Sequence, residues 1–178
     1  MNVMAEKTLD GEFHGILIDS DLAVHTDTLP DNGCSSLQCI GTLPFMAVEL
    51  LTDDAVVHHF QHDLESYSYI LVWISAHYDE GGCRDHIHDV LSLWQTSSLE
   101  DIQVRKMRFV AQPSVLYERP LTAFYKPLKT EWLQPLHAIL RLVHRTWEDN
   151  MDPDLPQQPM KDIALYQEFF DVLRVNSP

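Results

Sequence analysis

The sequence predicts a mainly α-helical fold with one small β-hairpin at the amino-terminal end. A run of β-branched and apolar residues at 15–18 follows the turn signal Asp10-Gly11, which predicts a hairpin that pairs residues 3–4 with 13–18. Farther along the chain, apolar residues recur mostly at the spacing of amphipathic helices. The length of 178 residues suits one domain with one hydrophobic core.

The helices are expected at residues 62–77, 87–94, 98–111, 131–147 and 163–172. The first is apolar around nearly its whole circumference, and only its start is polar, which indicates a helix buried on all sides. Ser98 is a candidate N-cap, and Pro135 fits only in the first turn of its helix or at a kink.

The amino-acid composition argues against some classes of binding partner. The net charge is −15, from 12 basic and 27 acidic residues. We therefore expect no nucleic-acid partner and no anionic membrane surface, because both need clustered Lys and Arg. No apolar run approaches the roughly 20 residues that a membrane-spanning helix needs. The three cysteines, Cys34, Cys39 and Cys83, make no disulfide framework, which favours an intracellular location in the cytoplasm or nucleus.

Asp19 is the first candidate for chemistry, because it directly follows the apolar run at 15–18. A carboxylate after a short strand is held rigidly, and Mg²⁺ prefers hard oxygen ligands of this kind. Taken alone, the stretch favours an aspartate that caps a turn. A metal-binding aspartate is favoured instead when the stretch is considered together with residues 41–49 and 62–69, whose resemblance to a known family is described next.

Three segments together resemble the C-terminal lobe of protein kinases. Residues 15–23 (GILIDSDLA), 41–49 (GTLPFMAVE) and 62–69 (HDLESYSY) resemble its metal-binding motif, the end of its activation segment and the start of its central helix. The resemblance is closest to the fungal-type protein kinase family, whose metal motif reads Asp-Phe-Asp-Leu-Ala where residues 19–23 read Asp-Ser-Asp-Leu-Ala. The stretch Asp-Leu-Glu-Ser also resembles the casein kinase family.

The resemblance implies a protein kinase-like C-terminal lobe whose N-terminal lobe is absent. Residues 1–178 would form a single partial domain. The metal motif and activation segment would lie at 15–49, the central buried helix at 62–77 and a helical subdomain at 85–175.

The resemblance also assigns roles to residues. Asp19 would bind Mg²⁺ and, through it, ATP. Thr42 would shape the site for the substrate hydroxyl. Glu49 would be buried against an arginine, since a buried carboxylate needs a partner. Of the candidates Arg141 and Arg145 we favour Arg145, and the alternative is a Glu49 exposed in the first turn of a helix.

Asp63 would open the central helix and accept backbone hydrogen bonds from the catalytic loop. The alternative is an ordinary helix-start carboxylate. His58 and His62, four residues apart, could share a helix face as zinc ligands do. No cysteine pair lies nearby and no glutamate completes the helical metalloprotease pattern, which favours structural or solvent-facing histidines. The basic stretch 105–108 is expected to be a solvated helix face.

The implied activity is ATP-dependent phosphoryl transfer to serine or threonine of a protein. Residues 1–178 contain no Gly-rich phosphate loop, no strand lysine paired with a helix glutamate and no His-Arg-Asp catalytic loop. We therefore expect the C-terminal-lobe portion of a kinase, inactive as this isolated chain. The alternative is a non-catalytic, pseudokinase-derived helical module that binds a protein. Self-association through an apolar face that includes Ile16, Ile18 and Leu22 is also expected.

Overall fold

The structure is a computed structural model that describes residues 2–18, 42–52, 56, 58–84, 89–112, 121–151, 154 and 162–175. The described strands are β1 (Asn2–Lys7), β2 (Phe13–Ile18), β3 (Tyr78–Asp79) and β4 (Gly82–Cys83). The described helical elements are the short turns η2 (Leu43–Phe45) and η3 (Glu49–Leu51), the helices α1 (Phe60–His77), α2 (Asp89–Thr96) and α3 (Leu99–Ala111), the π-helical turn η4 (Lys129–Leu133), and the helices α5 (Gln134–Met151) and α6 (Asp162–Val175). The mainly α-helical class is therefore confirmed.

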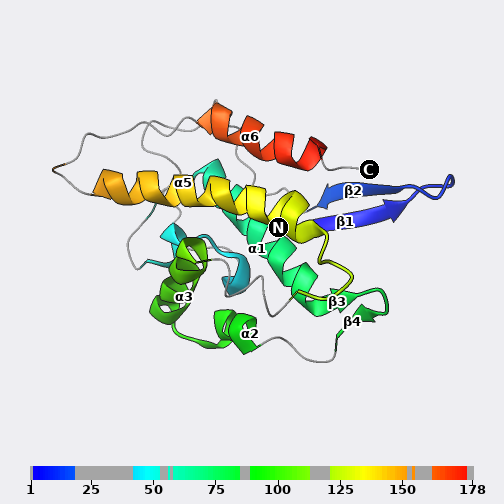
Figure 1. The fold of residues 1–178 in the computed structure, drawn as a ribbon, viewed down its shortest axis with the longest axis horizontal. Coiled ribbons are helices and arrows are strands. Elements are labelled where there is room, and N and C mark those ends of the chain that lie inside the picture. The colour runs from blue at the N-terminus through cyan, green and yellow to red at the C-terminus, as the bar shows by residue number, and fades with distance from the viewer. Residues whose placement is uncertain are drawn as a thin grey trace.

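Helix α1 runs through the middle of the described structure and meets most of the other helices (Figure 1). Helices α5 and α6 pack against α1 and against each other, and α3 packs against both α2 and α5. The turn η2 contacts α1 and α2, and η3 contacts α3. The hairpin β1–β2 extends away from the helices at one end of the molecule (Figure 1).

The predicted hairpin is confirmed. Strands β1 and β2 pair antiparallel, with Val3 opposite Leu17 and Met4 opposite Ile16. The turn is closed by the N–H of Thr8, which donates to the carbonyl of Glu12 at 2.8 Å. Gly11 lies in the turn with φ of 87°, a conformation that a residue with a Cβ rarely adopts.

The predicted helices are present with small shifts of their ends. Ser98 caps α3 as expected, because its side chain accepts a hydrogen bond from the N–H of Asp101 at 3.2 Å. Pro135 is the second residue of α5, directly after η4. Proline cannot donate the regular backbone hydrogen bond at that place, which explains why an irregular turn precedes the helix.

The burial of α1 differs from the expectation of an apolar helix covered on all sides. Its buried positions include five polar residues, Gln61, His62, Glu65, Ser68 and Ser75. Its large apolar residues Leu64, Leu71 and Trp73 are only partly buried. The buried residues recur three or four positions apart and so share one face, which means that the protected stripe of the central helix mixes these polar side chains with the apolar Tyr69, Val72 and Ala76.

The apolar core lies between α1, α2, α3 and η4. Its buried members are Tyr69, Val72, Ala76, Leu91, Trp94, Phe109, Leu121 and Leu133. The rings of Tyr69 and Trp94 meet edge to face at 5.2 Å, and both also contact Phe109. A smaller apolar cluster, Met46 with Leu51 and Ile102, lies under the short turns.

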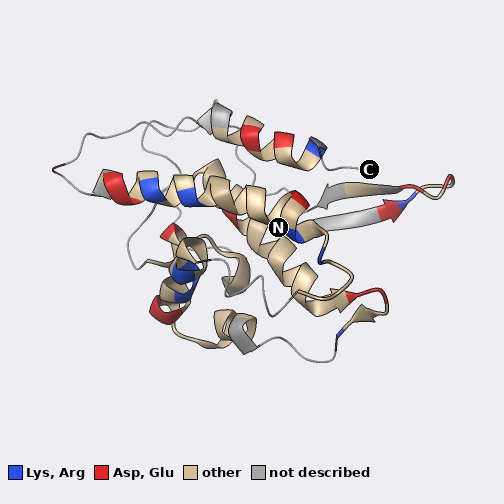
Figure 2. Cartoon of the chain, in the orientation of Figure 1, with Lys and Arg blue, Asp and Glu red and all other residues tan. Residues whose placement is uncertain are grey.

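Charged residues occur mostly on the hairpin and on the outer helices α3, α5 and α6, whereas α1 has few of them (Figure 2). No helix within the described residues is long and apolar enough to cross a membrane.

Replacing Trp94 by alanine should lower the free energy of unfolding by about 3–5 kcal/mol, because it would leave a large cavity in the core. Trp94 is 1% exposed, whereas Phe124 is 54% exposed, so Phe124→Ala is the matched control and should change stability by less than about 0.5 kcal/mol. Urea denaturation followed by circular dichroism measures both variants. Equal effects of the two substitutions would show that Trp94 is not central to the core.

Candidate functional site

Residues 43–51, which we call the docked segment, lie against the central helix without forming a long helix or a strand. Their middle is almost fully buried, with Ala47 and Val48 at 0% exposure. Pro44 lies in the first turn of η2, and the segment's own backbone supplies only a few hydrogen bonds, such as Leu51 N–H to Val48 O at 3.1 Å. Because buried backbone groups need partners, side chains of the surrounding helices have to supply the rest.

Glu65 of α1 is one of these side chains. It is 3% exposed, and its Oε1 accepts the backbone N–H of Val48 at 2.9 Å and the hydroxyl of Tyr69 at 2.5 Å. Its Oε2 lies 3.2 Å from Nε2 of His144, which reaches in from α5. The ring nitrogen of His144 is not aligned for a hydrogen bond, so we regard this contact as a charge pair.

The two partners shift each other's pKa. Burial alone would raise the pKa of Glu65, but the contact and charge of His144, together with the hydrogen bonds from Tyr69 and Val48, outweigh it and lower the pKa. Burial alone would lower the pKa of His144, but the carboxylate of Glu65, helped by the charges of Glu49 and Glu148, raises it. Both shifts favour the charged pair.

Glu49 forms a second buried contact between the docked segment and α1. Its Oε2 lies 2.8 Å from Nε2 of His62, and its Oε1 accepts a longer hydrogen bond of 3.5 Å from Gln61. On the other side of the ring, Nδ1 of His62 accepts the N–H of His59 at 3.1 Å. An Nδ1 that accepts carries no proton, so Nε2 of His62 holds the ring proton and donates it to Glu49.

The expected pairing of Glu49 with Arg145 is wrong in this structure. Glu49 is buried as expected, but no arginine within the described residues pairs with it, and its partner is His62. Arg145 and Arg141 are both exposed on α5. Successive residues of a helix point about 100° apart, so the inward position of His144 turns Arg145 toward solvent.

Lys106 of α3 also holds the docked segment, and its burial corrects the expectation of a solvated face at 105–108. It is 0% exposed, and its Nζ donates to the carbonyl of Leu43 at 3.0 Å and to the carbonyl of Met46. The ammonium lies 4.4 Å from the centre of the Tyr69 ring, whose hydroxyl binds Glu65. Only the neighbouring arginines of that stretch face solvent.

The other residues singled out from the sequence are more peripheral or lie outside the described residues. Asp19 lies outside them, as do the side chains of Ile16, Ile18 and Leu22. Thr42 is exposed just before η2, and its side chain makes no capping hydrogen bond.

Asp63 lies at the exposed start of α1, where its carboxylate is 3.4 Å from Nε2 of His58. The hydrogen bond with Asp63 raises the pKa of His58, although partial burial opposes the shift. Asp63 therefore fits the alternative interpretation, a carboxylate near solvent at the start of a helix.

Two residues of the site, Glu65 and His144, were missed from the sequence, whereas His62 was expected to be structural or solvent-facing and Lys106 to lie on a solvated helix face. His62, Glu65 and Tyr69 occur at positions i, i+3 and i+7 of α1, a spacing that places polar groups on one helix face. That spacing could have indicated a buried polar cluster on one face of α1. Nothing local in α3 or α5 indicates that Lys106 and His144 face the same point.

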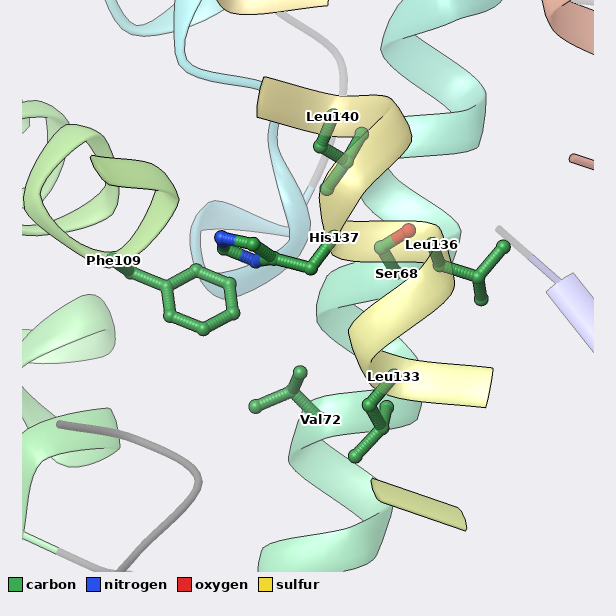
Figure 3. A pocket seen from close by; sticks show the side chains of 7 residues that line it. All are labelled: Ser68, Val72, Phe109, Leu133, Leu136, His137 and Leu140. Atoms are coloured by element: carbon green, nitrogen blue, oxygen red, sulfur yellow. The ribbon is translucent and has the colours of Figure 1, made fainter. Parts of the chain in front are cut away.

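Asp19, which would hold the implied magnesium ion, lies outside the described residues, and within the described residues no group of three or more His, Cys, Asp or Glu is placed to hold a metal ion. A cavity between α1, α3 and α5 has a volume of about 10 Å³, room for about one water molecule. Its lining residues are Ser68, Val72, Phe109, Leu133, Leu136, His137 and Leu140 (Figure 3). It is too small for a nucleotide.

Residues 1–75 match the family model described as fungal protein kinase. This match confirms the predicted resemblance to the fungal-type protein kinase family over that stretch, which includes the hairpin, the docked segment and most of α1. No curated protein matches the chain significantly, and neither does any solved structure.

The pair of Glu65 and His144 should stabilise the fold most between about pH 4.5 and pH 6.5. The pKa of Glu65 lies below its ordinary value of 4.5, so its contribution is present above pH 4.5 and is lost as the pH falls through the lowered pKa. The pKa of His144 lies above its ordinary value of 6.5, so its contribution is present below pH 6.5 and is lost as the pH rises through the raised pKa.

A double-mutant cycle with Glu65→Gln and His144→Gln measures this coupling by urea denaturation at about pH 5.5 and about pH 8.5. We expect a coupling of about 1–3 kcal/mol at the lower pH and a smaller one at the higher pH. A coupling that is the same at both values would contradict the charge pair.

His62 should be a neutral imidazole with its proton on Nε2, because Nδ1 accepts a backbone N–H. Long-range ¹H–¹⁵N NMR spectra at about pH 7 distinguish the two ring nitrogens. We expect a protonated Nε2 and an unprotonated Nδ1 for His62, and averaged signals for His14, whose side chain is 64% exposed. A proton found on Nδ1 of His62 would rule out the hydrogen-bond arrangement given above.

Proposed function

We propose that residues 1–178 form the C-terminal-lobe portion of a fungal-type serine/threonine protein kinase, and that they hold the substrate loop of that kinase on a helical scaffold. One observation carries the proposal. The segment that resembles the end of an activation segment is buried against α1 and bound there by Glu65 and His62. All of these residues lie within the stretch that matches the fungal protein kinase family.

The geometry suits a positioning role. A loop that orients a substrate hydroxyl has to be rigid, because a displacement of about 1 Å can cost about 100-fold in rate. In the docked segment, Val48 binds Glu65, Glu49 binds His62, and the carbonyls of Leu43 and Met46 bind Lys106. Thr42 directly precedes the docked segment and is exposed, as a residue that meets a substrate would be.

The phosphoryl-transfer chemistry belongs to the complete kinase. Mg²⁺ would neutralise charge on the phosphates of ATP, and Asp19 is the residue that would hold it. A protein substrate or protein partner and an intracellular location are parts of the same proposal. Because residues 1–178 contain no phosphate-binding lysine and no catalytic-loop aspartate, we propose that this chain does not transfer phosphate by itself.

The isolated chain should show no phosphotransfer from radiolabelled ATP with Mg²⁺ or with Mn²⁺. A chimera tests the kinase role directly, with residues 1–178 replacing only the matching residues of an active fungal-type kinase, which keeps its own phosphate-binding lysine and catalytic loop. It should transfer phosphate, and Asp19→Ala should lower the rate of the chimera by about 100-fold or more, since a bound metal contributes several kcal/mol.

Glu12→Ala, in the exposed turn of the hairpin, is the control and should leave the rate of the chimera unchanged. A chimera that folds but does not transfer phosphate would favour the non-catalytic interaction module. Turnover by the isolated chain that Asp19→Ala abolishes would refute its proposed inactivity.

A further inference from the structure

Helices α3 and α5 expose a group of arginines on an acidic chain. The whole chain has 12 basic and 27 acidic residues and a net charge of −15. Four arginines nevertheless face solvent on these two helices, together with two large apolar side chains that are 59% and 58% exposed. We call this set the arginine patch, and its members are Val104, Arg105 and Arg108 of α3 and Arg141, Leu142 and Arg145 of α5.

The two helices meet close to these arginines. The ring centres of Phe109 on α3 and His137 on α5 are 4.9 Å apart, and Nε2 of His137 donates to the carbonyl of Val110 at 2.8 Å. Arg105 lies four residues before Phe109, which places it one turn away on the same side of α3. Arg141 lies four residues after His137 on the same side of α5. Figure 2 shows basic residues of both helices at one end of the molecule.

The acidic residues of the same helices lie farther from this contact. On α3, Glu100 and Asp101 occupy the first turn, about 12 Å or more along the helix axis from Phe109. On α5, Glu148 follows both arginines and lies about 16 Å along the axis from His137. On each helix the arginines therefore lie nearer the contact than the carboxylates do, and the charges of the two signs are separated.

The four guanidinium groups form no ion pair with a carboxylate of any described residue. Suitable spacings exist, because Asp101 lies four residues before Arg105 and Asp149 lies four residues after Arg145. Each guanidinium keeps its N–H donors for another acceptor, and their planar fork matches the two oxygens of a carboxylate. The patch is therefore positive and has donors that an anionic ligand can use.

We propose that the arginine patch is a docking surface for an acidic segment of a partner protein. Carboxylates of the segment pair with the arginines, and its apolar side chains cover Val104 and Leu142. The negative charge of the remaining surface repels an acidic segment, so this charge directs the segment to the one place where the sign is reversed. The exposed apolar side chains favour a protein over a nucleic acid, whose phosphates use only the cations. The inference does not depend on the proposed kinase role.

A peptide with the repeat Glu-Glu-Leu is the probe, and it is added to the ¹⁵N-labelled full chain in an NMR titration at low salt. The backbone N–H signals of Val104, Arg105, Arg141 and Leu142 should shift, whereas those of α6 should not. The affinity should fall when the salt concentration rises from about 0.05 M to about 0.5 M, because exposed charges are then screened. Absence of binding at about 1 mM peptide overturns the proposal.

The double variant Arg105→Gln/Arg141→Gln should bind the peptide about tenfold more weakly, at about threefold for each exposed ion pair that is lost. The matched control is Arg84→Gln/Arg174→Gln, which changes the net charge equally through two exposed arginines outside the patch. This control should change the affinity by less than about twofold. Equal weakening by the two double variants overturns the proposal, because net charge and not the patch would then determine binding.

A peptide with the repeat Glu-Glu-Ser tests the apolar part of the surface. It should bind about threefold or more weakly, because it buries less apolar area against Val104 and Leu142. Equal affinity of the two peptides overturns the assignment of these two side chains to the docking surface.

Other occupants of the patch give different results. Tighter binding of a duplex DNA oligonucleotide than of the Glu-Glu-Leu peptide overturns the choice of a protein partner. A wild-type dimer in sedimentation that Arg105→Gln/Arg141→Gln abolishes also overturns it, because a second copy of the chain would then occupy the patch.

These outcomes are independent of phosphotransfer. If the kinase chimera is inactive but the peptide binds at the arginine patch, the proposed function fails and the docking surface stands. If the chimera is active and the peptide does not bind, the docking surface fails and the proposed function stands.

Discussion

The structure depends on one buried carboxylate, that of Glu65. An ionised carboxylate without partners in a protein interior is so costly that it would become neutral or the region would unfold. Its partners come from three different parts of the chain: the Tyr69 hydroxyl from α1, the Val48 N–H from the docked segment and His144 from α5. If any of these partners were removed, the buried carboxylate of Glu65 would lose part of its compensation and the fold would be less stable. The positions of α1, α5 and the docked segment therefore depend on one another.

The docked segment explains why the central helix buries the polar side chains of Gln61, His62 and Glu65. A stretch without a long helix or strand leaves backbone groups that only side chains can satisfy. Glu65 and Lys106 bind those groups directly, and His62 binds the Glu49 side chain. The family match ends at residue 75, yet Lys106 and His144 lie beyond it. The matched stretch is therefore held in place by helices that the match does not cover.

Local signals predicted most of the fold correctly. The Asp10-Gly11 turn and the run of β-branched and apolar residues after it were enough for the hairpin, and Ser98 was enough for the start of α3. Glu49 was identified as a site residue, but its partner was not, because a salt bridge depends on which helix face turns inward. Arg145 and His144 are adjacent in the sequence, and only packing decides which of the two is buried.

By itself, the sequence determined the mainly helical class, the positions of the elements and the resemblance to fungal-type protein kinases, since these follow from periodicity, caps and short motifs that act over a few residues. The tertiary structure alone decided that a lysine of α3, a histidine of α5 and a carboxylate of α1 meet at residues 43–51. The physical reason is distance along the chain. Burial of a charge is compensated by groups that are 17 to 79 residues away, and no local pattern encodes such a meeting.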